Sequence, residues 1–362
     1  MKTLTQVQPR TDIGTLLGDS TNLYVISQPG SYYLTGNITG VPGKHGISIQ
    51  ASNVTIDLDG FAVTSPSATT FNGIDVPAAQ TNVAIRNGIV TGWSKGVNAS
   101  GATNGVFEQL QASANGTGLS AGTNFLVKAC VATGNSGDGI DTNFGTTVTN
   151  CTAGSNTGTG IAAGLACTVT NCSAFSNVGN GIFIDHGSTV NNCSASFNAN
   201  GISTHDNCVV SNCSARFNNG IGISTGLACT VINCTASASG SNGISTGANS
   251  AVSSCSAYNN FGPGDGINVS SNCLVTGNNA NSNNHDGIHA TAGGNRIESN
   301  IVWNNVNAGI EPAGINQGNV IIKNSAGNNK SGGNNYALAS GNNDYGPFGK
   351  PGTATNPLTN FQ

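Results

Sequence analysis

The sequence predicts an all-β fold, a single-stranded right-handed parallel β-helix of about 13 coils with three short strands per coil. Two periodic patterns and the composition support this prediction. A Gly followed by Ile, Val or Leu recurs about every 21 residues, and a Cys recurs at nearly the same spacing. Gly accounts for 52 of the 362 residues, whereas charged residues make up only 7%. Solvated helices and coiled coils need many more charged residues, so the composition excludes them.

The marker glycine sets the number of coils. It lies at Gly46, Gly73, Gly96, Gly118, Gly139, Gly160, Gly181, Gly201, Gly222, Gly243, Gly266, Gly287 and Gly309. Leucine-rich repeats have a similar length, but they need several Leu per repeat and a helical arc, which this sequence does not offer. Short β-branched runs between Gly, Asn and Ser turns instead indicate strands that stack coil on coil, about 4.8 Å apart. Parallel crossovers are right-handed by strong preference, which gives the expected hand.

Alternation along each strand predicts which side chains face the core. In the first strand, which starts at the marker glycine, Ile182 and Ile184 face inward and Phe183 faces outward. The second and third strands are predicted to place Cys167, Val169, Cys172 and Ala174 inside.

Two further ladders have structural explanations. One Asn per coil recurs between the second and third strands, at Asn150, Asn171, Asn192, Asn212 and Asn233. Asn tolerates left-handed backbone and hydrogen-bonds its copies in adjacent coils. The Cys ladder runs through Cys130, Cys151, Cys172, Cys193, Cys213, Cys234 and Cys255. Because stacked Cβ atoms about 4.8 Å apart lie outside the disulfide range, we interpret these thiols as small buried core residues rather than as a metal or redox array.

The ends of the chain differ from the repeats. Residues 1–40 carry longer apolar side chains and are predicted to form an N-terminal cap, followed by the β-helix over residues 41–326. Residues 327–362 are predicted to form a C-terminal capping tail, with one domain overall. The tail contains Pro347, Pro351 and Pro357, which cannot donate to a strand ladder.

The composition also limits the partners. Eleven Lys and Arg scattered along the chain make no basic stripe, so we expect no nucleic-acid partner. No apolar run is long enough for a membrane span. We expect a monomer.

Two segments resemble a known superfamily. The string ISQPGSYYLTGNITG, then GISI and NVTIDLDGFAV, precede the Gly-Ile coils, and DYGP stands near the end. Over nearly the whole chain this resembles the right-handed parallel β-helix repeat proteins of the pectin-lyase-like superfamily, in a bacterial secreted branch. The resemblance implies an extracellular protein whose signal peptide has been removed, and polysaccharide chemistry by uronate lyases or glycoside hydrolases.

The first candidate site, the Asp185 cluster, consists of Asp185, His186, His205 and Asp206. These residues lie four and five positions after the marker glycine on consecutive coils, so Asp185 should lie beside His205 and His186 beside Asp206. A His steered by a carboxylate suits a general base near neutral pH. Two His and two Asp also suit a divalent cation. The third interpretation is a solvated turn in which opposite charges lie side by side.

The second candidate site, the Asp265 cluster, consists of Asp265, Asn268, His285, Asp286, His289 and Glu311. Asp265 and Asp286 directly precede marker glycines on consecutive coils, and like charges this close should raise one carboxyl pKa and retain a proton for general acid catalysis. Carboxylates about 5 Å apart suit a retaining glycosidase, and more distant pairs suit inversion. Alternatively, Asp265, Asp286 and Glu311 bind Ca²⁺, the one cofactor we consider. Polar turn residues without a function are the third interpretation.

Comparison with two enzyme types of the superfamily refines these candidates. Polygalacturonase-type members carry catalytic Asp residues before the Gly-hydrophobic strand, which Asp265 and Asp286 match in part, but their Gly-His-Gly and Arg-Ile-Lys elements are absent from the neighbouring coil. Calcium-dependent pectate lyases use a basic abstractor, for which Arg216 is the nearest candidate. We assign Phe183, Asn268 and Arg216 to substrate binding.

The sequence therefore predicts a secreted β-helix that cleaves polysaccharide, as hydrolase or lyase, in a groove on the outer face of the Gly-Ile strands. Its candidate catalytic residues are the charged members of the Asp185 and Asp265 clusters. The alternative is a non-catalytic solenoid whose Asn, Ser and Thr face is structural or binds glycan at a surface. Regular repeats without long inserted loops favour this alternative.

Overall fold

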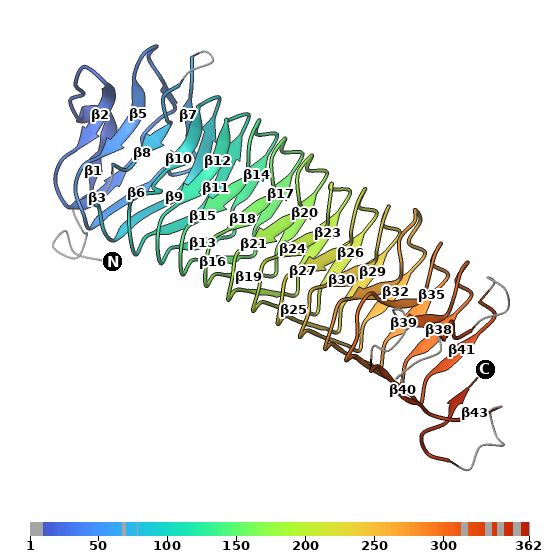
Figure 1. Cartoon of the computed structure of the whole chain (residues 1–362). Helices are drawn as coiled ribbons and strands as arrows, with labels where there is room; N and C mark the ends of the chain where they lie inside the picture. The colour runs from blue at the N-terminus through green and yellow to red at the C-terminus, as the bar shows by residue number, and fades with distance from the viewer. Residues whose placement is uncertain are drawn as a thin grey trace, which may run out of the picture. The chain divides into compact units, whose positions relative to one another are not determined.

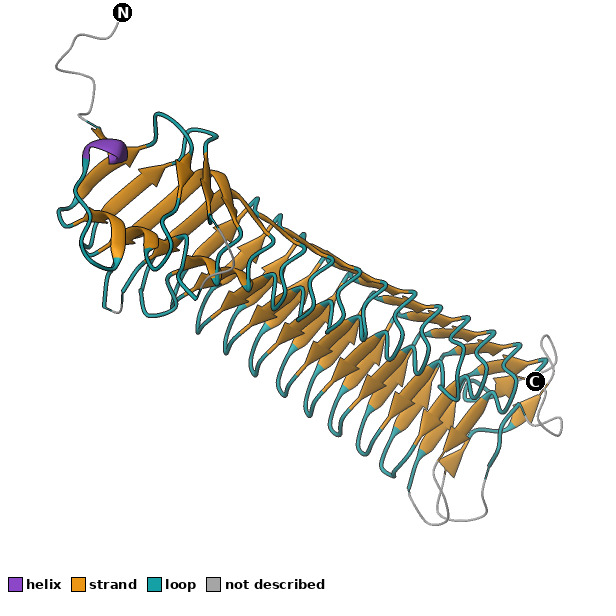
Figure 2. Cartoon of the chain, turned by 90° about the horizontal axis from the view of Figure 1, so that it is seen from above, coloured by secondary structure: helices purple, strands orange, loops and turns teal. Residues whose placement is uncertain are grey.

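The computed structural model describes residues 10–66, 70–77, 79–312, 318–329, 335–338, 344–349 and 356–361. The chain divides into two compact units, residues 1–179 and 180–362, and each is a stack of parallel strands (Figure 1). The one helical element in the described ranges is a single 3₁₀ turn, η2 (Ile13–Thr15), drawn in purple in Figure 2. No helix in those ranges is long and apolar enough to cross a bilayer.

In the first unit, first strands alternate with second and third strands along the chain. The first strands are β2 (Asn22–Ile26), β5 (His45–Ile49), β8 (Ile74–Asp75), β10 (Lys95–Asn98), β12 (Thr117–Ala121), β15 (Ile140–Thr142) and β18 (Ile161–Ala163). The others are β1 (Thr11–Asp12), β3 (Gly30–Tyr33), β4 (Ile38–Thr39), β6 (Val54–Asp57), β7 (Ala62–Thr64), β9 (Val83–Thr91), β11 (Val106–Ser113), β13 (Leu126–Lys128), β14 (Val131–Thr133), β16 (Thr147–Thr149), β17 (Thr152–Gly154), β19 (Thr168–Thr170) and β20 (Ser173–Phe175).

The second unit repeats three strands per coil. First strands are β21 (Ile182–Ile184), β24 (Ile202–Thr204), β27 (Ile223–Thr225), β30 (Ile244–Thr246), β33 (Ile267–Val269), β36 (Ile288–Ala290) and β39 (Ile310–Pro312). Second strands are β22 (Thr189–Asn191), β25 (Val209–Ser211), β28 (Thr230–Ile232), β31 (Ala251–Ser253), β34 (Leu274–Thr276), β37 (Arg296–Glu298) and β40 (Val320–Ile322). Third strands are β23 (Ser194–Ser196), β26 (Ser214–Arg216), β29 (Thr235–Ser237), β32 (Ser256–Tyr258), β35 (Asn279–Asn281), β38 (Ile301–Trp303) and β41 (Ser325–Gly327).

The predicted all-β class and parallel strands are confirmed, with two differences in detail. Each unit has seven first strands within the described ranges, fourteen in all, so the coil count is one higher than the thirteen marker glycines. The additional strand is β2, which begins without a Gly-aliphatic pair but pairs with β5 in parallel register. In two coils the second and third strands run together as the long strands β9 and β11.

In the described part of the tail, three more strands follow the last coil: β42 (Asp344–Tyr345), β43 (Phe348–Gly349) and β44 (Asn360–Phe361). Strand β42 pairs with β40, and β44 pairs with β41. Pro347 lies between β42 and β43, whereas Pro351 lies outside the described residues. The described parts of the tail therefore continue the ladders of the last coil.

The core consists of small inward side chains, as the alternation predicts. Ile182 and Ile184 are fully buried while Phe183 between them is partly exposed. All eleven cysteines lie in described segments; all are buried and none is in a disulfide. The predicted turn ladder is also confirmed, since each of its five Asn residues has a φ between 52° and 54°.

The cysteines have a second role that burial alone does not explain. The backbone N–H of Cys130 donates to Sγ of Cys151 one coil later, and the N–H of Cys234 donates to Sγ of Cys255. From Cys255 onward the acceptor is an Asn: the N–H of Cys255 donates to Oδ1 of Asn278 at 2.9 Å. Cys and Asn thus share one inward position that satisfies a buried backbone N–H of the preceding coil.

Candidate functional site

The Asp265 cluster is built on three consecutive first strands. Strands β33, β36 and β39 pair so that Asn268, His289 and Glu311 lie opposite one another in a column. Asp265 and Asp286 precede the marker glycines of β33 and β36. The structure thus brings together the residues that the coil spacing placed in register.

Asp265 is the centre of this cluster. Its side chain is only 5% exposed, and it accepts hydrogen bonds at both oxygens. Nδ1 of His285 lies 2.6 Å from Oδ1, and Nδ1 of His289 lies 3.0 Å from Oδ2. Asn268 donates to Oδ2 at 2.8 Å, and the N–H of Asp286 donates to Oδ1 at 3.2 Å. Four donors on one buried carboxylate hold both imidazole rings in place.

Asp286 is fully buried and less well satisfied. Its Oδ1 accepts from Nδ2 of Asn307 at 2.7 Å and from the N–H of Ala308 at 2.8 Å. Its Oδ2 has no hydrogen bond, although Nδ1 of His285 lies 3.2 Å away. A buried carboxylate oxygen without a donor favours the protonated form.

The pKa values of the Asp265 and Asp286 carboxyl groups are shifted in opposite directions. Burial, strengthened by the charge of Glu311, raises the pKa of Asp286 to about 6. Burial alone would raise the pKa of Asp265 too, but hydrogen bonds from His289, His285 and Asn268 outweigh it and hold that pKa below its ordinary value. The two carboxyls do differ as expected, but burial rather than like-charge repulsion is the largest cause.

Both histidines bind a proton more tightly than a free imidazole. The hydrogen bond to Asp265 raises the pKa of His289, against the effect of burial. Burial lowers the pKa of His285, but the hydrogen bond to Asp265 and the charge of Asp286 outweigh it and raise this pKa overall. Since an ionised Asp265 can only accept, each Nδ1 carries its proton, and Nε2 is the nitrogen that exchanges protons with a ligand. The His285 and His289 side chains are 41% and 26% exposed, so solvent reaches both rings.

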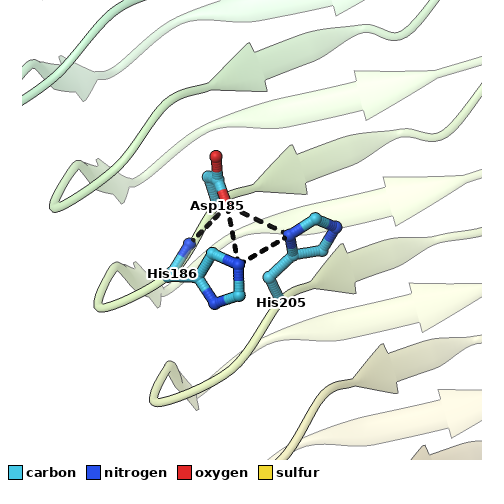
Figure 3. A group of neighbouring side chains, drawn as sticks. All are labelled: Asp185, His186 and His205. Carbon is cyan, nitrogen blue, oxygen red and sulfur yellow. Dashed lines mark hydrogen bonds and ion pairs between the residues drawn. The ribbon is translucent and has the colours of Figure 1, made fainter.

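The Asp185 cluster lies in the turns that follow β21 and β24. Figure 3 shows the side chains of Asp185, His186 and His205 pointing toward one another from two adjacent coils. Nδ1 of His205 lies 3.0 Å from Oδ1 of Asp185, and Nδ1 of His186 lies 3.6 Å from Oδ2 of Asp206. Both predicted neighbour pairs are therefore present. All four side chains are about one-third to one-half exposed, in contrast to the buried carboxylates of the Asp265 cluster.

The three predicted substrate-binding residues lie apart from one another. Phe183 packs edge-on against His205 with ring centroids 5.2 Å apart, and Asn268 belongs to the Asp265 cluster. Arg216 ends the third strand β26, and its guanidinium lies over the ring of Phe217 at 5.3 Å. Arg216 thus belongs to a different corner of the coil from Asp185 and His205, which follow first strands.

An aromatic pair at that corner was not predicted. Phe197 and Phe217 stack with centroids 5.2 Å apart and an interplanar angle of 10°, and they are 60% and 43% exposed. Both have left-handed backbone, with φ of 58° and 54°, where a bulky side chain is an outlier. Their 20-residue spacing, one coil apart, is the sequence signal that would have revealed them.

The sequence of the coils that carry these sites matches a known family model. Residues 34–167, 163–296 and 202–326 match the family model for a right-handed β-helix region. The chain belongs to the right-handed β-helix family. This match confirms both the predicted class and the predicted hand.

Solved structures share the fold of this β-helix at low sequence identity. One is the A-module of the mannuronan C-5 epimerase AlgE4 from Azotobacter vinelandii, with a TM-score of 0.50, 13% identity, and coverage of 84% of this chain and 97% of that one. The A-module of AlgE6 from the same organism also has a TM-score of 0.50, with 14% identity and coverage of 97% and 98%. Identities this low show the fold alone. No curated protein matches this β-helix in sequence.

The donor set bears on the calcium prediction. Ca²⁺ takes six to eight oxygen ligands, whereas both oxygens of Asp265 and Oδ1 of Asp286 already accept protein hydrogen bonds. Calcium would have to displace these donors. Calcium at Asp265, Asp286 and Glu311 stays a prediction, and the function proposed below does not use it.

Proposed function

We propose that this β-helix acts on a uronate-containing polysaccharide as a lyase, with His285 and His289 as the acid–base pair. The observation that carries this proposal is the single buried carboxylate of Asp265 between the Nδ1 atoms of both rings. It fixes the tautomer and orientation of two partly exposed imidazoles, which is what proton transfer at Nε2 requires.

The protonation chemistry of the pair supports this role. Both pKa values are raised, and the positive charge of His289 opposes protonation of His285. This repulsion favours loss of the first proton from the pair, which leaves one imidazolium and one neutral ring. The neutral ring takes the C5 proton of a uronate, the C4–O4 bond breaks as the C4–C5 double bond forms, and the imidazolium gives its proton to O4.

A lyase fits the burial of the carboxylates better than a two-carboxylate hydrolase. A glycosidase needs two carboxyl groups that contact the scissile bond. Asp265 and Asp286 are 5% and 0% exposed, which suits positioning groups that act through the histidines. Elimination instead needs a base at C5, an acid at O4 and a hydrogen-bond donor to the uronate carboxylate, and we assign this last role to Asn268 on the same column as His289.

The chemistry of the two structural relatives is consistent with this assignment. They are named as epimerases acting at C-5 of mannuronan, the position at which we place proton abstraction. We also propose that the protein is secreted, as polysaccharide substrates are extracellular.

The test is a panel of uronate and neutral polysaccharides, followed by the ultraviolet absorbance of unsaturated products. We expect activity on a uronate polymer, and a loss of about 10²- to 10⁴-fold in kcat for His285→Ala and for His289→Ala. Ser245→Ala is the matched control, because Ser245 precedes Asn268 in the same column. Wild-type activity in both histidine variants would refute the assignment. Reducing sugar without new absorbance would indicate a hydrolase.

A second candidate function is glycan binding without catalysis, and the aromatic pair favours it. Phe197 and Phe217 present stacked rings to solvent beside Arg216, and exposed aromatic faces are suited to stacking on sugar rings. The left-handed backbone recurs at this turn in neighbouring coils, as at Ser176 and Ala238, so the exposed stacked rings alone carry this candidate. Loss of glycan binding in Phe197→Ser, together with no activity on any polysaccharide in the panel, would support this second function over the first.

A further inference from the structure

The Asp185 cluster has an arrangement of donor atoms that the proposed lyase chemistry does not use. Oδ1 of Asp185 lies 3.5 Å from Nε2 of His186 and 3.0 Å from Nδ1 of His205. The two ring nitrogens lie 3.2 Å apart. One carboxylate oxygen and two imidazole nitrogens thus form a small triangle on the surface of two coils (Figure 3).

We infer that this triangle binds a divalent transition-metal ion through Asp185, His186 and His205. Metal bonds to imidazole and carboxylate are about 2.0 to 2.2 Å long, so adjacent ligand atoms around one ion lie about 2.8 to 3.6 Å apart. The three separations of the triangle are close to this range. Two His and one carboxylate favour Zn²⁺ and its neighbours over Ca²⁺, which takes oxygen ligands. The side chains are 32–49% exposed, which leaves room for water to complete the coordination.

Three contacts restrict the proposed ligands. The N–H of His186 donates to Oδ1 of Asp185 at 2.8 Å, and the thiol of Cys208 donates to the backbone carbonyl of Asp185 at 3.2 Å. Phe183 packs edge-on against the ring of His205. These contacts restrict the first and third ligands before an ion arrives, which reduces the ordering that binding must produce.

Asp206 contacts Nδ1 of His186, the ring nitrogen that does not face the proposed metal. Its Oδ2 lies 3.6 Å from Nδ1 of His186, while its own N–H donates to that nitrogen at 3.2 Å. A metal bound at Nε2 of His186 requires the ring proton to sit on Nδ1. The hydrogen bond from the N–H of Asp206 to Nδ1 would then be replaced by one from Nδ1–H to Oδ2 of Asp206. A carboxylate–histidine–metal arrangement of this kind orients the ligand and strengthens its binding. In turn, Oδ1 of Asp206 is held by the N–H of Leu227 at 2.7 Å.

The cluster is confined to two coils. Position four after the marker glycine is Asp185 and His205 here, but Gly226 and Gly247 in the next two coils and Ser270 in the third. The site therefore does not extend as a column, and we expect one ion per chain. Ser270 offers a control position on the same kind of turn.

The test is isothermal titration calorimetry of Zn²⁺ into the untagged full chain after treatment with a chelator. We expect one saturable site, which His205→Ala and Asp185→Ala abolish and Asp206→Asn weakens about 10- to 100-fold. Ser270→Ala should bind as the wild type does. Far-UV circular dichroism checks that each variant is folded, and these exposed positions should tolerate substitution.

A second variant separates this site from the other group of potential ligands. Asp265, His285 and Asp286 also lie close enough to share an ion. The double variant His285→Ala/His289→Ala should keep the zinc site, and this outcome does not depend on whether the lyase proposal is right. Absence of saturable Zn²⁺ binding, or binding lost in the double variant and kept in His205→Ala, would overturn the inference.

Discussion

The Asp265 and Asp185 clusters each contain two Asp and two His residues and differ in where the coil places them. Asp265 stands directly before a first strand, where donors from its own coil and the next cover it, and its side chain is 5% exposed. Asp185 follows a first strand in an open turn and is 32% exposed. In the buried site the carboxylate of Asp265 orients two rings. In the open site Oδ1 of Asp185 and one nitrogen of each ring form the triangle that we propose as a metal site. Position on the coil thus sets how far each carboxylate is buried.

The strongest test of this comparison is the loss of each carboxylate. Asp265→Ala removes the acceptor of four hydrogen bonds in a buried site, and we expect the free energy of unfolding to fall by about 3 to 5 kcal/mol. Asp185→Ala breaks only exposed contacts, so its cost should stay within about 1 kcal/mol. Denaturant unfolding of both variants measures the difference. Equal losses would mean that burial does not distinguish the clusters.

The second test uses pH and Asp286. Its pKa rises from the usual 3.8 to about 6 on folding, so the folded state binds this proton more tightly than the unfolded chain. Its contribution to stability is therefore fully present below pH 4 and is lost as the pH rises through 6, by up to about 3 kcal/mol.

Asp286→Asn mimics the protonated group and should remove this dependence. We expect the variant to match the wild type at pH 4 and to be more stable at pH 8, as measured by denaturant unfolding at both values. Ser245→Ala on the same face should follow the wild-type curve throughout. If Asp286→Asn is instead less stable than the wild type at pH 8, Asp286 is ionised and paired in the folded protein.

The third test extends the comparison from clusters to ladders. Nδ2 of Asn283 donates to the carbonyl of Ala257 at 3.0 Å and to Oδ1 of Asn305, and Oδ1 of Asn283 accepts from Asn260. Replacing this buried Asn by Ala leaves several groups without partners, and we expect a loss of about 2 to 3 kcal/mol. Asn233→Ala in the exposed turn ladder should cost about 1 kcal/mol or less. Urea unfolding measures the stability loss in each variant. Similar losses for Asn283→Ala and Asn233→Ala would contradict the distinction between the buried and the exposed Asn ladder.

The sequence reveals the coils and the neighbours within each cluster, because both follow from a fixed repeat. The 20- and 21-residue steps place Asp185 beside His205 and Asn268 beside His289, as register confirms. Burial is different, because it depends on how each turn folds over its neighbour. Nothing in the string His285-Asp286-Gly287 distinguishes a surface turn from the covered position that Asp286 occupies.

Two features escape prediction although the repeat contains them. The inward Asn ladder through Asn115, Asn135, Asn156 and Asn177 has the same spacing as the cysteines. Polar residues are usually expected outside, so a buried ladder of amides is recognised only when its hydrogen bonds are seen. Strand β2 lacks the marker glycine, and for that reason the coil to which it belongs is not counted from the sequence.

The smallest expected effect is at the exposed aromatic corner. Phe217→Asn replaces a bulky residue at φ 54° by one that tolerates left-handed backbone, but it removes the stacking on Phe197 and the contact with Arg216. The relief of backbone strain and the lost aromatic contact are each about 1 kcal/mol and opposite in sign, so unfolding free energy should change by less than about 1 kcal/mol. Binding to immobilised polysaccharide should nevertheless fall if the pair stacks on sugar. Thermal unfolding and binding assays on one preparation separate the two effects, with Asn259→Ala, at the same left-handed turn of a later coil, as the control. A large loss of stability would instead show that the pair is structural, and that exposed as well as buried contacts hold this corner of the coil.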